Sequence, residues 1–71
     1  MIIKSSLELL GEIRKFMFLN KYNNETIASK RNVSAQSISN FFNSSNPNFN
    51  TILETIDALD SELYIEIRKK E

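Results

Sequence analysis

Polar residues with helix-capping chemistry divide this chain of 71 residues into four stretches with helical apolar spacing. Ser5 and Glu8 have the spacing of a capping box, in which the hydroxyl and the carboxylate each accept a backbone amide. Asn and Ser side chains also accept the free amides of a first helical turn. The other start signals are, in chain order, Asn23 or Asn24, Ser34 and Asn48. The chain is therefore predicted to be all-α, a compact domain with four helices.

Apolar residues recur at three- and four-residue steps within these stretches, which indicates helices that each bury one face. The first helix is expected to end in the stretch 20–24, the second near Arg31 and the third near Phe42. Pro47 cannot continue a helix and belongs to the loop before the fourth. The residues expected to point inward are Leu9, Leu10, Ile13, Phe16, Met17 and Leu19, then Ile27, Ala28 and Val33, then Ala35, Ile38, Phe41 and Phe42, and finally Phe49, Ile52, Leu53, Ile56 and Leu59.

The last part of the chain changes period. Apolar Leu63, Ile65 and Ile67 alternate with polar neighbours, and period two indicates a β-strand. A helix continued from Leu59 at four-residue steps also fits, but we favour the strand. A lone strand needs a partner, so these three residues are the expected dimer interface. We therefore divide the chain into a helical domain, 1–60, and a C-terminal tail that pairs between two copies, 61–71.

The composition excludes several kinds of chemistry. Without Cys or His there is no thiolate, disulfide, zinc site or imidazole base. A Walker loop needs two glycines, and Gly11 is the only one. The acids Glu54, Asp57 and Asp60 are interpreted as a solvated helix face. We expect no enzymatic activity, no cofactor and no small-molecule substrate.

The chain also lacks the sequence signals of a membrane or secreted protein. No apolar run approaches the roughly 18 residues of a membrane span. Glu8 and Glu12 interrupt the region where a signal peptide would be apolar. The protein is expected to be cytoplasmic.

Two predicted short helices meet at a tight turn in the middle of the chain. Asn32 stands where the chain reversal needs positive φ, which Asn tolerates better than most residues. The spacing matches a helix-turn-helix, and a generic corner between two helices is the alternative. Residues 32–53 contain no charged side chain in a chain that is 25 % charged. Solvated faces normally carry many charges. This segment is therefore predicted to have a role that selects uncharged, hydrogen-bonding side chains.

The third helix places three amides in one row. At 100° per residue, Gln36, Asn40 and Asn43 lie opposite Ile38. Asn and Gln amides can pair bidentately with adenine in the major groove of DNA. The row is therefore predicted to read DNA bases, with a merely solvated polar face as the alternative.

Charge is unevenly distributed along a chain whose net charge is zero. Residues 1–13 sum to −1, residues 14–46 to +4 and residues 47–71 to −3. The basic third holds the predicted helix-turn-helix. Few cations near the groove imply modest non-specific affinity and a shallow salt dependence for a monomer.

The motif as a whole resembles the Cro/C1-type (Xre) family of phage and plasmid repressors. The segments that carry the resemblance are Glu12–Lys15, Thr26–Phe41, Pro47 and Leu53–Leu59. The resemblance implies a compact, lambda-repressor-like domain of four or five helices. It also implies that this domain binds double-stranded DNA as a homodimer, with its third helix in the major groove. This chain departs from the family pattern at Asn32 and Ser44, which replace frequent glycines. It also departs at Phe42, which replaces a frequent Glu and is expected to extend the core.

The resemblance also implies site residues. Positions matching base contacts are Ala35, Gln36, Ser37 and Asn40. Positions matching phosphate contacts are Asn24, Ser34, Asn43 and Ser44, and Lys21 is expected to join them. The chain looks most like the antitoxin repressors of HipA-like kinase toxins, which implies a toxin protein as a partner. This likeness rests on Ile38–Phe41, the Asn- and Pro-rich loop that follows, the fourth helix and the terminal apolar strand. Phage Cro proteins and restriction-modification controllers share the same scaffold. The rival interpretation is a protein-interaction module with weak or no specific DNA binding.

Overall fold

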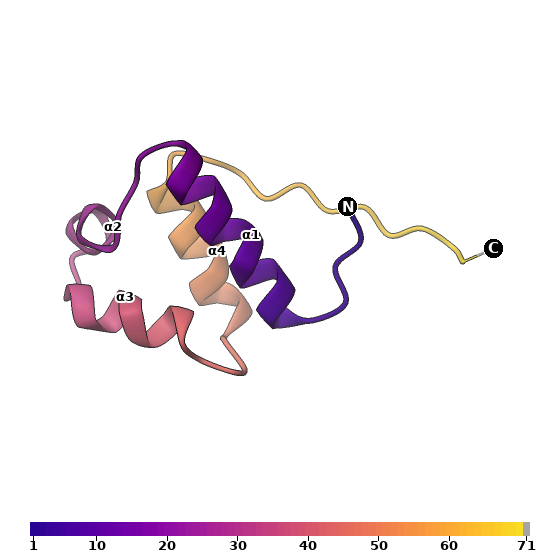
Figure 1. Ribbon diagram of the computed structural model, residues 1–71, viewed down its shortest axis with the longest axis horizontal. Helices are drawn as coiled ribbons and strands as arrows, with labels where there is room; N and C mark the ends of the chain where they lie inside the picture. Colours follow the sequence, from indigo (N-terminus) through magenta and orange to yellow (C-terminus); the bar gives the residue numbers. More distant parts are fainter. Residues whose placement is uncertain (71) are drawn as a thin grey trace.

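Each of the four helices begins at a predicted capping residue. The computed structural model describes residues 1–70. Side-chain oxygens of Ser5, Asn23, Ser34 and Asn48 accept backbone amides of the first turns, which satisfies donors that a helix itself leaves free. The expected four helices are confirmed, and the described residues contain no fifth helix. The helices are α1 (Ser6–Leu19), α2 (Asn24–Arg31), α3 (Ala35–Phe42) and α4 (Phe49–Ala58) (Figure 1).

The turn between α2 and α3 depends on one left-handed residue. Asn32 has φ 56° and ψ 45°, as the sequence predicts, and ends α2 in the conformation that most side chains avoid. The amide of Val33 donates to the carbonyl oxygen of Ala28 at 3.0 Å. The three residues 32–34 therefore suffice to reverse the chain before α3 begins.

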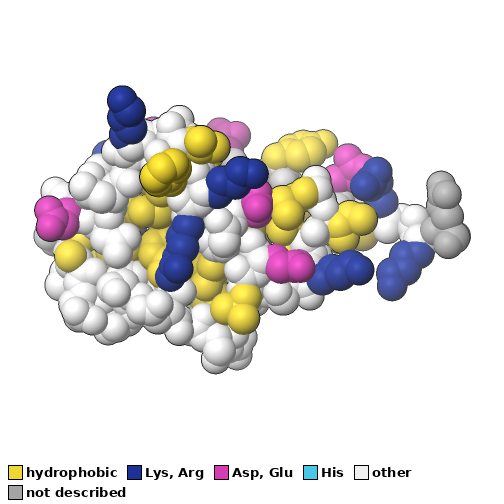
Figure 2. Space-filling view, in the orientation of Figure 1, with side chains coloured by type: hydrophobic (Ala, Val, Ile, Leu, Met, Phe, Trp, Pro, Cys, Tyr) yellow, Lys and Arg dark blue, Asp and Glu magenta, His cyan; other side chains and the backbone are white. Residues whose placement is uncertain are grey.

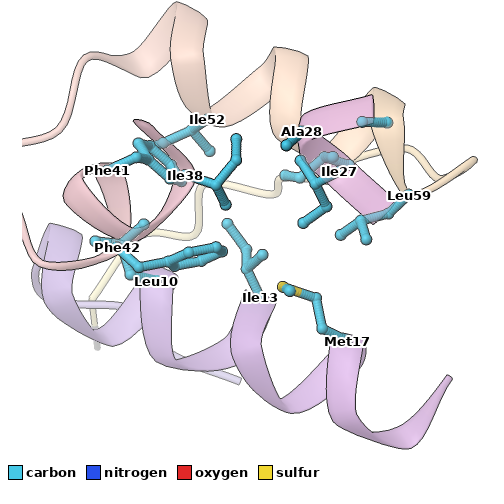
Figure 3. Close-up of a cluster of buried hydrophobic side chains, with 12 residues drawn as sticks. Leu10, Ile13, Met17, Ile27, Ala28, Ile38, Phe41, Phe42, Ile52 and Leu59 are labelled. Atoms are coloured by element: carbon cyan, nitrogen blue, oxygen red, sulfur yellow. The ribbon is translucent and has the colours of Figure 1, made fainter. Parts of the chain in front are cut away.

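One apolar core holds the four helices together. Side chains of α1 point toward those of α2 and α3 (Figure 3), and Ile27 and Ile38 are completely buried. Phe42 is also buried, which confirms that it extends the core. The buried apolar residues are Leu10, Ile13 and Met17 of α1, Ile27 and Ala28 of α2, Ile38, Phe41 and Phe42 of α3, and Ile52, Ile56, Ala58 and Leu59 of α4 and its C-terminal end.

Fewer apolar side chains are buried than the apolar pattern predicts. On α1, Phe16 lies about 90° around the helix from the mean direction of the buried residues, so it flanks the core. On α4, the fully buried Thr55 takes the inward position, and its hydroxyl donates to the carbonyl oxygen of Thr51 at 2.8 Å. The residues predicted inward that are instead exposed are Phe16, Leu19, Val33, Ala35, Phe49 and Leu53.

The C-terminal tail has neither predicted conformation in this single chain. Residues 61–70 form no regular secondary structure and extend away from the helices along the longest axis of the molecule (Figure 1). Neither the strand nor the continued helix is present there. No second strand lies beside residues 61–70 to accept their backbone hydrogen bonds, and Asp60, with a φ of 55°, takes the left-handed conformation that ends the helical stretch. Glu71, the last residue of the predicted tail, lies outside the described residues. Within residues 1–70, no helix is long and apolar enough to cross a membrane.

Candidate nucleic-acid interface

The outer face of α3 is polar, exposed and uncharged. Gln36, Ser37, Asn40 and Asn43 are exposed, while the opposite face of the helix is anchored by the completely buried Ile38. Figure 2 shows the surface over α3, at the lower left, without Lys, Arg, Asp or Glu side chains. The predicted amide row is therefore at the surface, facing away from the core.

Two amides of this row are joined to each other. Nε2 of Gln36 donates to Oδ1 of Asn40 at 3.0 Å. Each amide has two N–H donors and a carbonyl oxygen with two lone pairs, so Gln36 keeps its oxygen and one N–H free. Asn40 keeps both N–H groups and one lone pair. The hydrogen bond orients the two groups while leaving donors and acceptors for a ligand.

The start of α3 contains the other two predicted base contacts. Ala35 is the first residue of the helix and is exposed there. The Ser34 hydroxyl accepts the amide of Ser37 at 3.1 Å and lies 2.9 Å from the Ser37 hydroxyl. Ser34 therefore acts as the helix cap, and its hydroxyl is partly occupied by that role.

The predicted phosphate contacts other than Ser34, which caps α3 between the two helices, lie at the two ends of the α2–α3 unit. Asn24 is half-buried at the first position of α2, and exposed Lys21 precedes it in a turn where its φ is 60°. At the far end, Asn43 caps α3, and its backbone N–H donates to the carbonyl oxygen of Ser39 at 3.0 Å. Ser44 is half-buried, and its hydroxyl accepts the amide of Asn46 at 3.2 Å.

Arg14 also lies in this region, although no site role was predicted for it. Its Nη2 donates to the carbonyl oxygen of Phe42 at 3.0 Å, and its guanidinium lies 5.2 Å from the centre of the Phe42 ring. A cation at a helix C-terminus also interacts favourably with the helix dipole. Arg14 therefore ties α1 to the last turn of α3. No local spacing signals this contact, because the two residues are 28 positions apart.

Lys30 and Arg31, the two basic residues closest to α3 in the sequence, are engaged by acids from the C-terminal third. Arg31 Nη2 lies 2.9 Å from Glu54 Oε2, and Lys30 pairs with Asp60. Asp60 also accepts the Tyr22 hydroxyl at 3.2 Å. The ammonium of Lys30, followed by the hydroxyl of Tyr22, lowers the pKa of the Asp60 carboxyl. The hydrogen bond to Asp60 in turn raises the pKa of Lys30.

These shifts predict a small pH dependence of stability. Because the pKa of Asp60 is lowered, its contribution is complete above its ordinary value of 3.8 and is lost as the pH falls through the lowered value. Because the pKa of Lys30 is raised, its contribution is complete below 10.5 and is lost as the pH rises through the raised value. Asp60→Asn should therefore lower the urea midpoint at pH 7, and the difference from the parent should shrink below about pH 4.

Glu25→Gln is the matched control, since Glu25 makes no ion pair among the described residues. Unfolding curves from pH 3 to pH 7 measure both variants. A midpoint difference for Asp60→Asn that stays constant over this range would contradict the pairing.

The structure thus brings the base-contact candidates together on α3. The phosphate candidates are spread along the α2–α3 unit, with Ser34 in its central turn and the others at its two ends. The dimer candidates lie apart from both, in the tail, where Leu63 packs partly on the core and Ile65 and Ile67 are exposed.

No group of His, Cys, Asp or Glu in residues 1–70 could hold a metal ion. Comparisons with family models, curated proteins and solved structures found no match to this chain.

Proposed function

We propose that this chain is a sequence-specific regulator that binds double-stranded DNA as a homodimer and represses transcription. The observation that carries the proposal is the exposed, uncharged amide row of α3, in which Gln36 and Asn40 are already oriented by a mutual hydrogen bond. In this proposal α2 and α3 form a helix-turn-helix of the Cro/C1 type within a lambda-repressor-like domain. DNA binding would take place in the cytoplasm.

The chemistry of α3 suits the major groove. A helix with its side chains is about 10–12 Å across and the groove is about 12 Å wide. The amides of Gln36 and Asn40 offer the donor and acceptor that adenine N7 and N6 require. Ser37 can bond to bases or phosphates, and the methyl group of Ala35 can contact a thymine methyl.

Phosphate binding in this proposal relies on neutral donors. Asn24, at the start of α2, lies where backbone amides and the helix dipole favour an anion, with Lys21 nearby in sequence. Ser34, Asn43 and Ser44 would hold the backbone beside α3. Because Lys30 and Arg31 are engaged by acids, few counterions would be released on binding, so we expect a shallow salt dependence.

The homodimer gives the operator its symmetry. Two copies of α3 related by a two-fold axis would contact an inverted repeat with half-sites about 34 Å apart. Leu63, Ile65 and Ile67 would form the interface through paired tails. The resemblance to antitoxin repressors extends the proposal to autoregulation of an operon that also encodes a toxin partner.

Selection of the purified protein against randomised duplexes tests this function. An enriched inverted repeat with adenine in each half-site is the expected result. Failure to enrich any sequence at low salt would contradict the proposal.

Two substitutions separate base reading from phosphate binding. Gln36→Ala should lose about 1–3 kcal/mol, or roughly 5- to 150-fold in affinity, at its own base pair and relax the preference there. Asn24→Ala should instead weaken binding to all sequences alike. Titrations of the selected operator and of single-base variants measure both effects. An equal loss on every sequence from Gln36→Ala would contradict the base-reading role.

A protein-interaction module is the second candidate. It is favoured by the ion pairs that engage Lys30 and Arg31 and by exposed apolar residues on α1, among them Phe18 and Leu19. Large exposed apolar side chains of this kind are available for contacts with another protein. It becomes the better interpretation if the selection enriches no duplex while α3 remains folded.

A further inference from the structure

The C-terminal tail leaves its apolar side chains in water although its first residues are held against the domain. Ile65 is 59 % exposed and Ile67 is 95 % exposed. At the start of the tail, the Ser61 amide donates to the carbonyl oxygen of Ile56 at 3.2 Å, and Asp60 binds Tyr22 and Lys30. The tail therefore leaves the domain from a fixed point, with apolar groups that a single copy does not cover.

One face of the tail is defined by its contact with the core. Leu63 packs partly against the buried cluster. In an extended chain, residues two apart share a face, so Leu63, Ile65 and Ile67 would form one apolar face continuous with the core. The charged residues Glu62, Glu66 and Arg68 then occupy the other face.

We infer that two tails pair as an antiparallel ribbon in a single register, in which residues of the two copies face each other when their numbers sum to 130. This inference rests on the homodimer of the proposed function. In this register Ile65 faces Ile65 of the second copy, and Leu63 faces Ile67. Glu62 faces Arg68, which pairs opposite charges twice by symmetry. All six apolar side chains of the ribbon are thereby matched on one face.

Neighbouring registers lose these matches. Centred on Tyr64, the ribbon would place Glu62 opposite Glu66 twice. Centred on Glu66, it would place two Glu66 carboxylates together and leave Leu63 opposite Lys69. A parallel pair would align each charged residue with its own copy, and like charges directly opposite are destabilising. A register with an odd sum would mix the apolar and polar faces.

In this register, each copy's tail would also contact the core of the other copy. Since Ile67 of the second copy lies opposite Leu63, it would reach the edge of the first copy's core, so each domain would be completed by a residue of the other. Antiparallel strands rise about 3.4 Å per residue. The two Asp60 residues, ten positions apart in this register, would lie about 34 Å from each other.

Engineered cysteines test the register, because the chain contains no Cys of its own. Ile65→Cys should form an intermolecular disulfide under mild oxidation, since facing Cα atoms in antiparallel strands are about 4.5–5.5 Å apart. Ile67→Cys is the matched control. Its two copies would lie about 14 Å apart, so it should not cross-link alone but should cross-link when mixed with Leu63→Cys.

Charge reversal provides an independent measurement. Glu62→Arg and Arg68→Glu should each weaken the dimer roughly 2- to 30-fold in sedimentation experiments, and the double variant should recover. Cross-linking by Ile67→Cys alone, or a chain that stays monomeric at all concentrations, would overturn the inference.

The proposed function can fail separately. Enrichment of an inverted repeat without Ile65→Cys cross-linking would reject only the ribbon. A cross-linked ribbon whose parent protein enriches no duplex would reject only the DNA-binding function.

Discussion

Ile38→Ala is expected to lower the free energy of unfolding by about 2–5 kcal/mol. Ile38 is completely buried and projects from α3 into the cluster that also contains side chains of α1 and α2 (Figure 3). A domain of this length has a total stability of only about 4–11 kcal/mol. The variant should therefore be much less stable or partly unfolded, and it should lose operator binding because α3 is no longer held in place.

Ile2→Ala is the matched control, because it removes the same atoms from a side chain that is 67 % exposed. It should change stability by no more than about 0.5 kcal/mol. Urea unfolding followed by circular dichroism measures both variants. If the two unfold at the same midpoint, Ile38 does not pack as described.

Truncation after Asp60 is the second change with a large expected effect. It removes the proposed ribbon, so the protein should become a monomer and operator affinity should fall by about 100- to 10,000-fold, the range gained by linking two binding modules. Sedimentation and titration of the selected duplex measure the two effects. A truncated chain that still sediments as a dimer would contradict the role of the tail.

The truncated chain must be shown to remain folded. All buried core residues lie before Ser61, so its helical circular dichroism should be close to that of the parent. Ile65→Asp in the full-length chain provides a second variant, because it places two carboxylates together at the centre of the ribbon. It should weaken the dimer without shortening the chain.

The helix boundaries could be predicted because their causes are local. Ser5, Ser34 and Asn48 each bond to amides two or three residues ahead, and Asn32 adopts the left-handed conformation that its side chain tolerates. The helical period likewise predicted that α3 buries Ile38. These features depend on neighbours within one turn of helix, which the sequence displays directly.

The extent of burial could not be predicted in the same way. Phe16 and Leu53 fit the apolar stripes of α1 and α4, yet both lie beside the core and are exposed. Thr55 was absent from the predicted stripe but is completely buried, because its hydroxyl can bond to the carbonyl oxygen of Thr51 within the helix. Burial depends on which neighbouring helix covers each face.

The sequence by itself determined the four helix starts, the left-handed turn and the uncharged amide row, because each follows from side chains close together in the chain. Only the tertiary structure decided which charges are free. Ion pairs of Arg31 with Glu54 and of Lys30 with Asp60 offset part of the positive charge of residues 14–46. Arg14 donates a hydrogen bond to the end of α3. These partners are 23 to 30 positions apart, and only packing of the helices brings them within bonding distance.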